Sequence, residues 1–389
     1  MLVAAVIFAA VSAQASKARL QALGNSEHIV DIQEVFTREP DQALNYEAAT
    51  VEFGGTDITS TTPEAEGGFI RKMGDSAWSM YLGRSSTTYL DLVNGITANL
   101  GDAGLNLRDG HRQQNPLQLT YASKMGDINW GAGLFYVGNT YKGTSSFNAN
   151  GTAGTHDYQA SKVTQNIMGV LVGANNGVWD VQLRQGLVGE TKTDVTTAGT
   201  ALNTAGIADN TTLKVNSTGS TRVSGGYKMD SMYFYGAYGM GSGEVKSTGT
   251  VADVESTELL AGVVNSHTKD GVEFFYGAEY LSTMNKDKVG AGTKTEVTSV
   301  PLLVGVEAEV ASWLVLRGSL TQSLNLISQT KTTGGSATDP ADDTTARVGA
   351  GIKWGKATVD MVLGMGSTGT FGLDDDGNNF AQASVTYNF

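Results

Sequence analysis

The sequence predicts an all-β protein that forms a transmembrane antiparallel up-and-down β-barrel of about sixteen strands, within a range of roughly 14–18. Three observations support this prediction. After residue 43, apolar residues alternate with polar or small ones, as where Ala383, Val385 and Tyr387 alternate with Ser384 and Thr386, which gives a strand one apolar face. The alternating runs reach about ten residues or more, against the usual 5–6. Tight turns and long polar connections also alternate along the chain.

Alternating runs bounded by turn residues define the expected strands. They cover 44–54, 67–73, 76–85, 116–125, 128–140, 161–174, 177–190, 218–229, 231–243, 255–268, 271–284, 296–309, 312–326, 344–354, 357–367 and 379–389. An even number of strands returns the C-terminus to the side of the barrel where the first strand begins, as in single-chain bacterial barrels.

Short and long connections separate the two ends of the predicted barrel. Tight turns are expected near 72–75, 124–127, 175–177, 228–230, 269–271, 310–312 and 354–356. Long polar connections are expected at 148–162, 191–220, 246–256, 286–295, 331–345 and 368–379. Residues 86–115 interrupt this layout as a long inserted loop, for which a constriction folded into the barrel, an oligomer latch and a plain surface hairpin all stay open.

Composition excludes several classes of function. The 389 residues include 50 Gly and no Cys, and the formal net charge is −13. The absence of Cys excludes disulfides, thiolate metal sites and a Cys nucleophile, and an acidic chain argues against nucleic-acid binding. We expect no cofactor and no metal.

The N-terminal residues differ from the rest of the chain. Residues 1–15 combine an apolar run with Ala13-Gln14-Ala15, which predicts a secretory signal peptide cut after Ala15; a buried core helix is the alternative. Residues 16–42 carry mixed charges and helical spacing and are interpreted as a periplasmic or barrel-mouth segment, for which packing inside the barrel is one option. The barrel itself is assigned to 43–389.

The face opposite the apolar one carries the candidate functional residues, because charges that line a wide barrel set the preference of a pore. Side chains that only pair across a filled lumen are the alternative. The ten pore-lining candidates are Lys124, Asp180, Arg184, Arg222, Lys228, Glu273, Glu279, Arg347, Lys353 and Asp360.

Residues for the outer face can also be named. Each Trp lies within a few residues of a tight turn, which predicts one aromatic girdle at a membrane interface, with core Trp residues as the alternative. Small residues at Gly169, Gly173 and Ala350 are candidates for close packing of subunits. The interface aromatics are Trp78, Trp130, Trp179, Trp313 and Trp354.

Two segments resemble known families. The end of the chain, with Tyr387 two residues before the terminal Phe389, resembles the assembly signal of Gram-negative outer-membrane proteins. That resemblance implies an outer-membrane location, contact with lipopolysaccharide and handling by the outer-membrane assembly machinery. Residues 16–24 and 31–36 resemble the major porin-like outer-membrane protein of predatory Bdellovibrio-type bacteria, which implies a homo-oligomer, a trimer or pentamer, that encloses lipid.

An enzyme is the main alternative from a different functional class. The sequence has four His, namely His28, His111, His156 and His267, but no Gly-x-Ser-x-Gly elbow that opens a helix and no His-Glu-x-x-His motif. We therefore expect a non-enzymatic porin for passive diffusion of ions and small polar solutes. The alternative is a structural oligomer that encloses lipid and conducts little, and a secreted β-rich adhesin is a third possibility.

Overall fold

The computed structural model describes residues 16–53, 65–84, 116–147, 158–198, 210–247, 250–288, 293–332, 335–338, 343–368 and 378–389. The predicted signal peptide, the predicted inserted loop at 86–115, and His111 and His156 lie outside these residues.

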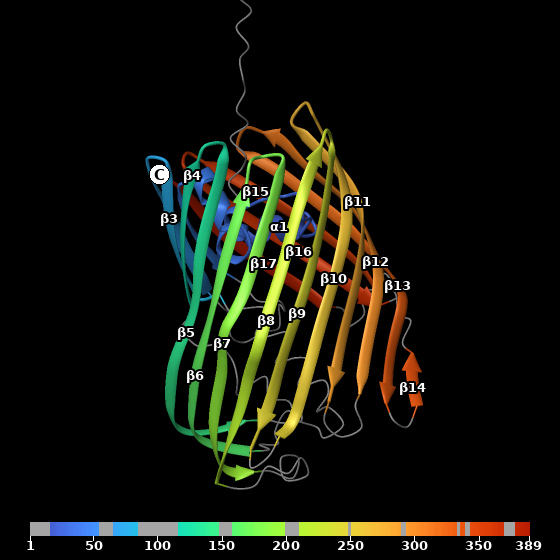
Figure 1. Cartoon of the computed structure of the whole chain (residues 1–389). Helices are drawn as coiled ribbons and strands as arrows, with labels where there is room; N and C mark the ends of the chain where they lie inside the picture. Colours follow the sequence, from blue (N-terminus) through green and yellow to red (C-terminus); the bar gives the residue numbers. More distant parts are fainter. Residues whose placement is uncertain are drawn as a thin grey trace, which may run out of the picture.

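The described strands form one closed antiparallel sheet, in which each strand pairs with its neighbours along the chain and β1 pairs with both β2 and β17 (Figure 1). The first half of the wall comprises β1 (Ala48–Phe53), β2 (Ala65–Met73), β3 (Ser76–Leu82), β4 (Leu117–Met125), β5 (Ile128–Phe147), β6 (Tyr158–Asn175), β7 (Trp179–Ala198) and β8 (Thr211–Met229). The second half comprises β9 (Met232–Lys246), β10 (Thr250–Lys269), β11 (Val272–Asp287), β12 (Lys294–Ala311), β13 (Leu314–Thr332), β15 (Asp343–Trp354), β16 (Ala357–Thr368) and β17 (Asn378–Asn388).

Each of these sixteen wall strands overlaps one of the sixteen predicted runs, so the prediction of an up-and-down barrel is confirmed. Several strands are longer than predicted: β7 and β8 both extend into 191–220, which was expected to be a long polar connection. A short additional strand, β14 (Gly335–Thr338), pairs with the end of β13 and was not predicted. The tight turns have the expected chemistry: Asp270 and Gly271 both have positive φ, the backbone of the two-residue turns whose twist matches that of the flanking strands.

The alternation gives the barrel an apolar outer face. Leu183, Val223 and Leu363 are 41%, 47% and 62% exposed, whereas their neighbours Gln182 and Val362 are buried toward the lumen. Such a wall leaves its backbone paired all round and presents apolar side chains to hydrocarbon, which is the arrangement that lets a sheet span a membrane. Among the described residues, no helix is long and apolar enough to cross a bilayer.

Three short helices lie inside the barrel, at the end where the tight turns are (Figure 1). They are α1 (Lys17–Ala22), α2 (Ile32–Thr37) and the 3₁₀ helix η1 (Pro40–Asn45). Helix α1 contacts β13 and β15–β17, and η1 contacts β3–β6. We call residues 16–46 the lumenal plug, because they reach the inner wall on opposite sides of the barrel.

One expectation about the outer face is wrong. Gly173 faces the lumen, where a Cβ would meet Asp41 of the plug. Gly169 lies on the same face, since it alternates in step with the buried Ile167 and Leu171. Only Ala350, between the exposed Val348 and Ile352, belongs to the outer surface. The period of two was right, but the small size of a residue did not reveal which face it occupies.

Candidate functional site

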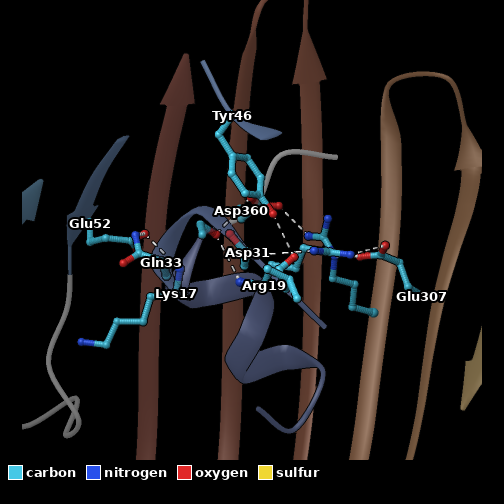
Figure 2. A network of polar contacts seen from close by, with 11 residues as sticks. Lys17, Arg19, Asp31, Gln33, Tyr46, Glu52, Glu307 and Asp360 are labelled. Carbon is cyan, nitrogen blue, oxygen red and sulfur yellow. Dashed lines mark hydrogen bonds and ion pairs between the residues drawn. The ribbon is translucent and has the colours of Figure 1, made fainter. Parts of the chain in front are cut away.

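A buried ionic network joins the plug to the wall (Figure 2). Arg19 of α1 holds Glu307 of β12 with two hydrogen bonds, of 2.8 Å from Nε and 3.0 Å from Nη2. The guanidinium of Arg317 on β13, which is fully buried, donates to the same Glu307 and to Asp360 of β16, both at 2.5 Å. Arg19 also lies 3.4 Å from Asp31, which precedes α2. Charge pairs with this geometry fix how the plug is oriented in the lumen.

A second polar group ties the plug to the first strands. The backbone N–H of Lys17 and the side-chain amide of Gln33 both donate to Glu52 of β1, at 3.0 and 2.7 Å. The ammonium of Lys17 lies 3.1 Å from Glu66 of β2, which also accepts two hydrogen bonds from Arg84. The plug is therefore fastened to both sides of the point where β1 closes the barrel on β17.

Apolar contacts fill the space between these polar groups. Phe36 of α2 packs on Tyr81 of β3 with ring centroids 4.4 Å apart, in a cluster that includes Ile70 and Ala122 of the wall. On the other side, Leu23 of the plug packs with Phe275 of β11 in a second cluster. Full burial of such side chains contributes about 1.5–3 kcal/mol each.

Wall glycines make room for the plug. A Cβ at Gly131 of β5 would lie 2.4 Å from the backbone of Pro40, and one at Gly349 of β15 would lie 2.6 Å from the Cβ of Ala22. On β6, Asn175 donates to the carboxylate of Asp41, beside Gly173. The inner wall is thus shaped to receive the start of η1 and the end of α1.

Burial changes the acid–base behaviour of carboxylates in the plug. Desolvation raises the pKa of Asp31 well above its ordinary value, although Arg19 opposes the shift. Desolvation likewise raises the pKa of Glu39 to about 8 and that of Asp41 to about 6. The charges around Glu39 are Arg38, which opposes the shift, and the carboxylates of Glu34, Asp180 and Asp41, which add to it. The docked plug therefore binds protons more tightly than the same segment in water.

We expect the plug to dock more weakly as the pH rises. The pKa values of Glu39 and Asp41 are raised above their ordinary 4.5 and 3.8, so their contribution to docking is complete below about pH 4 and is lost as the pH rises through about 6 to about 8. Trypsin cleavage after Arg38, whose side chain is buried against Glu34 and Glu39, measures undocking and should be faster at about pH 8.5 than at about pH 5. The Glu39→Gln variant should lose most of this difference after correction for the activity of trypsin itself. An equal difference in this variant would contradict the assignment to Glu39.

All ten pore-lining candidates lie at positions of their strands that face the lumen. Several of them contact the plug or its neighbours and do not line an open channel. Arg184 donates to the carbonyl of Thr37 at 2.6 Å, and Asp360 accepts from Ser16 at 3.1 Å. Asp180 and Glu279 accept hydrogen bonds from Tyr233 and Tyr235. Glu273 lies 3.5 Å from His28 of the plug. Three further candidates have partners on the wall: Arg222 pairs with Glu258, Arg347 donates to Thr321, and Lys353 pairs with Glu309. The last two, Lys124 and Lys228, lie exposed beside tight turns.

The predicted interface aromatics lie at the tight-turn end of the barrel. Trp78, Trp130, Trp313 and Trp354 are exposed, Trp354 by 86%, and Trp179 occupies the outward set at the start of β7. Tyr387 and Phe389 also point outward and contact each other edge to face, with centroids 6.0 Å apart. Their roles at the membrane interface and in assembly stay predictions.

Two cavities lie between the plug and the wall in the part of the chain that the structure describes. One of about 80 Å³ lies beside Thr37 and Arg184, and one of about 180 Å³ lies beside Ser26 and Leu303. Over the part of the chain that the structure describes, no group of three or more His, Asp or Glu side chains is placed to hold a metal ion.

The sequence reasoning missed the residues that hold the plug. Arg19, Asp31, Glu307 and Arg317 were not candidates, because Arg19 and Glu307 are 288 residues apart in the chain. The available signal was a charged residue in the inward set of a strand, as at Glu307 and Arg317, opposite an amphipathic segment with charges of its own.

His28 is the histidine that meets other polar side chains in the plug. Its Nδ1 lies 2.7 Å from the hydroxyl of Ser26, two residues away, and its Nε2 lies 3.5 Å from Glu273 of the wall. Its ring packs edge-on against Phe275 at 4.7 Å. These contacts attach the plug to β11, and the expectation that the chain is not an enzyme stays a prediction.

Comparison with known proteins gives matches among solved structures. No protein-family model and no curated protein matches the sequence. The Vibrio cholerae protein OmpT shares 10% identity and a TM-score of 0.39, covering 88% of this chain and 95% of its own. A porin refined at 1.8 Å resolution shares 10% sequence identity with this chain at a TM-score of 0.38. The match covers 88% of this chain and 99% of the porin. The Pseudomonas putida toluene transporter TodX shares 10% sequence identity with this chain at a TM-score of 0.40. The match covers 96% of this chain and 98% of TodX. No solute or partner of this chain follows from likenesses so distant.

The closed sheet and its apolar outer face define the class of protein by themselves. A barrel of sixteen antiparallel strands without a free edge and with an apolar outer face is an outer-membrane β-barrel. The protein resides in the outer membrane of a Gram-negative bacterium.

Proposed function

We propose that the protein is a porin-type diffusion channel for small polar solutes and that its lumenal plug closes it at rest. The observation that carries this proposal is the position of the plug, which reaches from β16 on one side of the lumen to β5 and β6 on the other. Barrels of this size have room for an aqueous passage when nothing fills them. The inward-facing charges support a polar lumen, and the plug supports low conductance in the resting state.

Conductance of the full-length protein in a planar bilayer tests this proposal. We expect a low basal current with occasional stepwise openings of porin size, because plug docking is reversible and sensitive to pH. A steady open current would contradict the closed resting state. Silence at every pH and voltage would contradict the channel and favour the structural role described next.

A structural oligomer that encloses lipid and conducts little is the second candidate function. The same filled lumen favours it, since a barrel that is permanently closed needs no route for solutes. The resemblance of residues 16–24 and 31–36 to the lipid-enclosing family adds to this candidate and implies a trimer or pentamer. A particle image of the purified protein, together with analysis of bound lipid, distinguishes the two: a ring of subunits around lipid and no current would replace the channel proposal.

A further inference from the structure

The ionic network around Arg19 lacks one positive charge. Two guanidiniums, of Arg19 and Arg317, face three carboxylates, of Asp31, Glu307 and Asp360, so with every group in its usual state the net charge is −1. The neighbouring group around Glu52 is balanced, because Lys17 and Arg84 face Glu52 and Glu66. An unbalanced buried charge is strongly destabilising unless it gains a partner or a proton.

Unpaired acceptors lie at the same place. The Oδ1 atom of Asp31, whose side chain is fully buried, has no hydrogen-bond partner among the described residues, and neither does Oε2 of Glu52, which is 2% exposed. Figure 2 shows Asp31 and Asp360 close together at the centre of the network, with Glu52 to one side. Buried acceptors of this kind are ordinarily satisfied by a donor.

Ser16 lies at the end of this network. It is fully buried, its hydroxyl donates to Asp360 at 3.1 Å and accepts from the backbone N–H of Arg19 at 3.2 Å. The next backbone N–H, of Lys17, donates to Glu52 at 3.0 Å. The main-chain nitrogen of Ser16 is three covalent bonds from its own hydroxyl oxygen and three from the nitrogen of Lys17, so it lies near both Asp360 and Glu52.

The sequence independently predicts a signal-peptide cut between Ala15 and Ser16. Hydrolysis of that peptide bond by an endopeptidase of the signal-peptidase class consumes one water, leaves a carboxylate on Ala15 and releases Ser16 with a free α-amino group. An α-amino group has an ordinary pKa of about 7.7–8.0, and nearby carboxylates favour its charged form.

We propose that Ser16 is the first residue of the mature protein and that its α-ammonium group is the missing cation of the plug network, bound by Asp360 and its neighbouring carboxylates. The cut then does more than release the protein from the export machinery, since it creates the charge that completes the docking site of the plug. In the uncut chain the same nitrogen is a neutral amide. The uncut chain therefore docks its plug with an uncompensated carboxylate or with a protonated one.

Mass spectrometry and amine labelling of the full-length protein, purified from outer membranes, test this proposal. Intact mass is expected to show removal of 15 residues, leaving 389 − 15 = 374. Acetylation of the folded protein, followed by analysis of the N-terminal peptide, should label the Ser16 amine at least about tenfold more slowly than after unfolding, as protected groups react through opening. The exposed Lys72 serves as an internal control that is labelled in both states.

Two variants separate an ion pair from simple burial. Asp360→Asn should restore fast labelling of the Ser16 amine in the folded barrel. Glu309→Gln, on β12 outside the network, should leave the protection unchanged, because Glu309 pairs with the Lys353 side chain near the tight turns. A different first residue, or equal labelling of Ser16 in the folded and unfolded wild type, overturns the proposal. Unchanged protection in a folded Asp360→Asn variant also overturns it. If that variant does not fold, the pH dependence of labelling in the folded wild type decides the question: an ion pair keeps the Ser16 amine charged and unreactive above the ordinary α-amino pKa of about 7.7–8.0, whereas burial without a partner lowers that pKa and overturns the proposal. None of these results depends on conductance.

Discussion

The Gly131→Ala substitution is expected to undock the lumenal plug and to raise the open fraction of the channel roughly tenfold to a hundredfold. The added Cβ would lie 2.4 Å from the backbone carbon of Pro40, and the rigid start of η1 has no flexible side chain there to move aside. Overpacking of this kind costs about 1–3 kcal/mol, and each 1.4 kcal/mol changes an equilibrium tenfold. The closed sheet of the wall does not need the plug contact for its own hydrogen bonds, so the barrel should still form.

Bilayer recordings of Gly131→Ala beside wild type measure this effect. Gly133→Ala is the matched control, because Gly133 lies two residues further along the same face of β5 and its added Cβ would meet neighbours at ordinary distances of 3.4–3.5 Å. Retained slow migration of the unboiled protein in gels verifies that each variant barrel has formed. If Gly131→Ala stays as closed as Gly133→Ala, the plug is not what limits conduction.

The Arg19→Ala substitution is expected to weaken plug docking by about 3–5 kcal/mol, the usual cost of removing one partner of a buried ion pair. It removes both hydrogen bonds to Glu307 and the contact with Asp31. Glu307 keeps Arg317 as a partner, whereas Asp31 loses the guanidinium that it contacts. Release of the plug, detected as rapid trypsin cleavage after Arg38 in an intact barrel, is the expected result.

Lys17→Ala provides the comparison for this second substitution. Lys17 lies on the same short helix and pairs with Glu66 at 3.1 Å, but its side chain is 35% exposed, and a pair of that kind contributes about 0–1 kcal/mol. A double-mutant cycle of Arg19→Ala with Glu307→Ala then gives the coupling energy of the central contact. Equal protease sensitivity of the Arg19 and Lys17 variants would show that the buried network does not hold the plug.

The wall of the barrel was predictable because its determinants are local. Strands such as β11 and β17 are visible as a period of two over more than ten residues, and their ends are marked by turn residues such as Asp270 and Gly271. The same period of two also predicts which face of the wall each candidate charge occupies. Asp360, for example, alternates with outward-facing residues and faces the lumen.

The residues that fill the lumen were harder to predict from the sequence. Helical spacing in residues 16–42 indicated short helices, and their place inside the barrel was one interpretation among others. Small residues were misleading, because Gly173 was assigned to subunit packing but instead makes room for Asp41. The pairing of Arg19 with Glu307 joins positions 288 residues apart in the chain, and the inward-facing charge on the strand was the one sequence signal for it.

The sequence by itself therefore determined the class of protein, the approximate positions of its wall strands and the two faces of its wall, but not the ends of strands such as β7 and β8. Only the tertiary structure decided that the lumen is occupied, which glycines receive the plug and which charges pair across it. The physical reason is that hydrocarbon imposes its constraint on every second residue of every strand. The interior of the barrel is constrained instead by complementary shape and charge between segments that meet only after the sheet has closed.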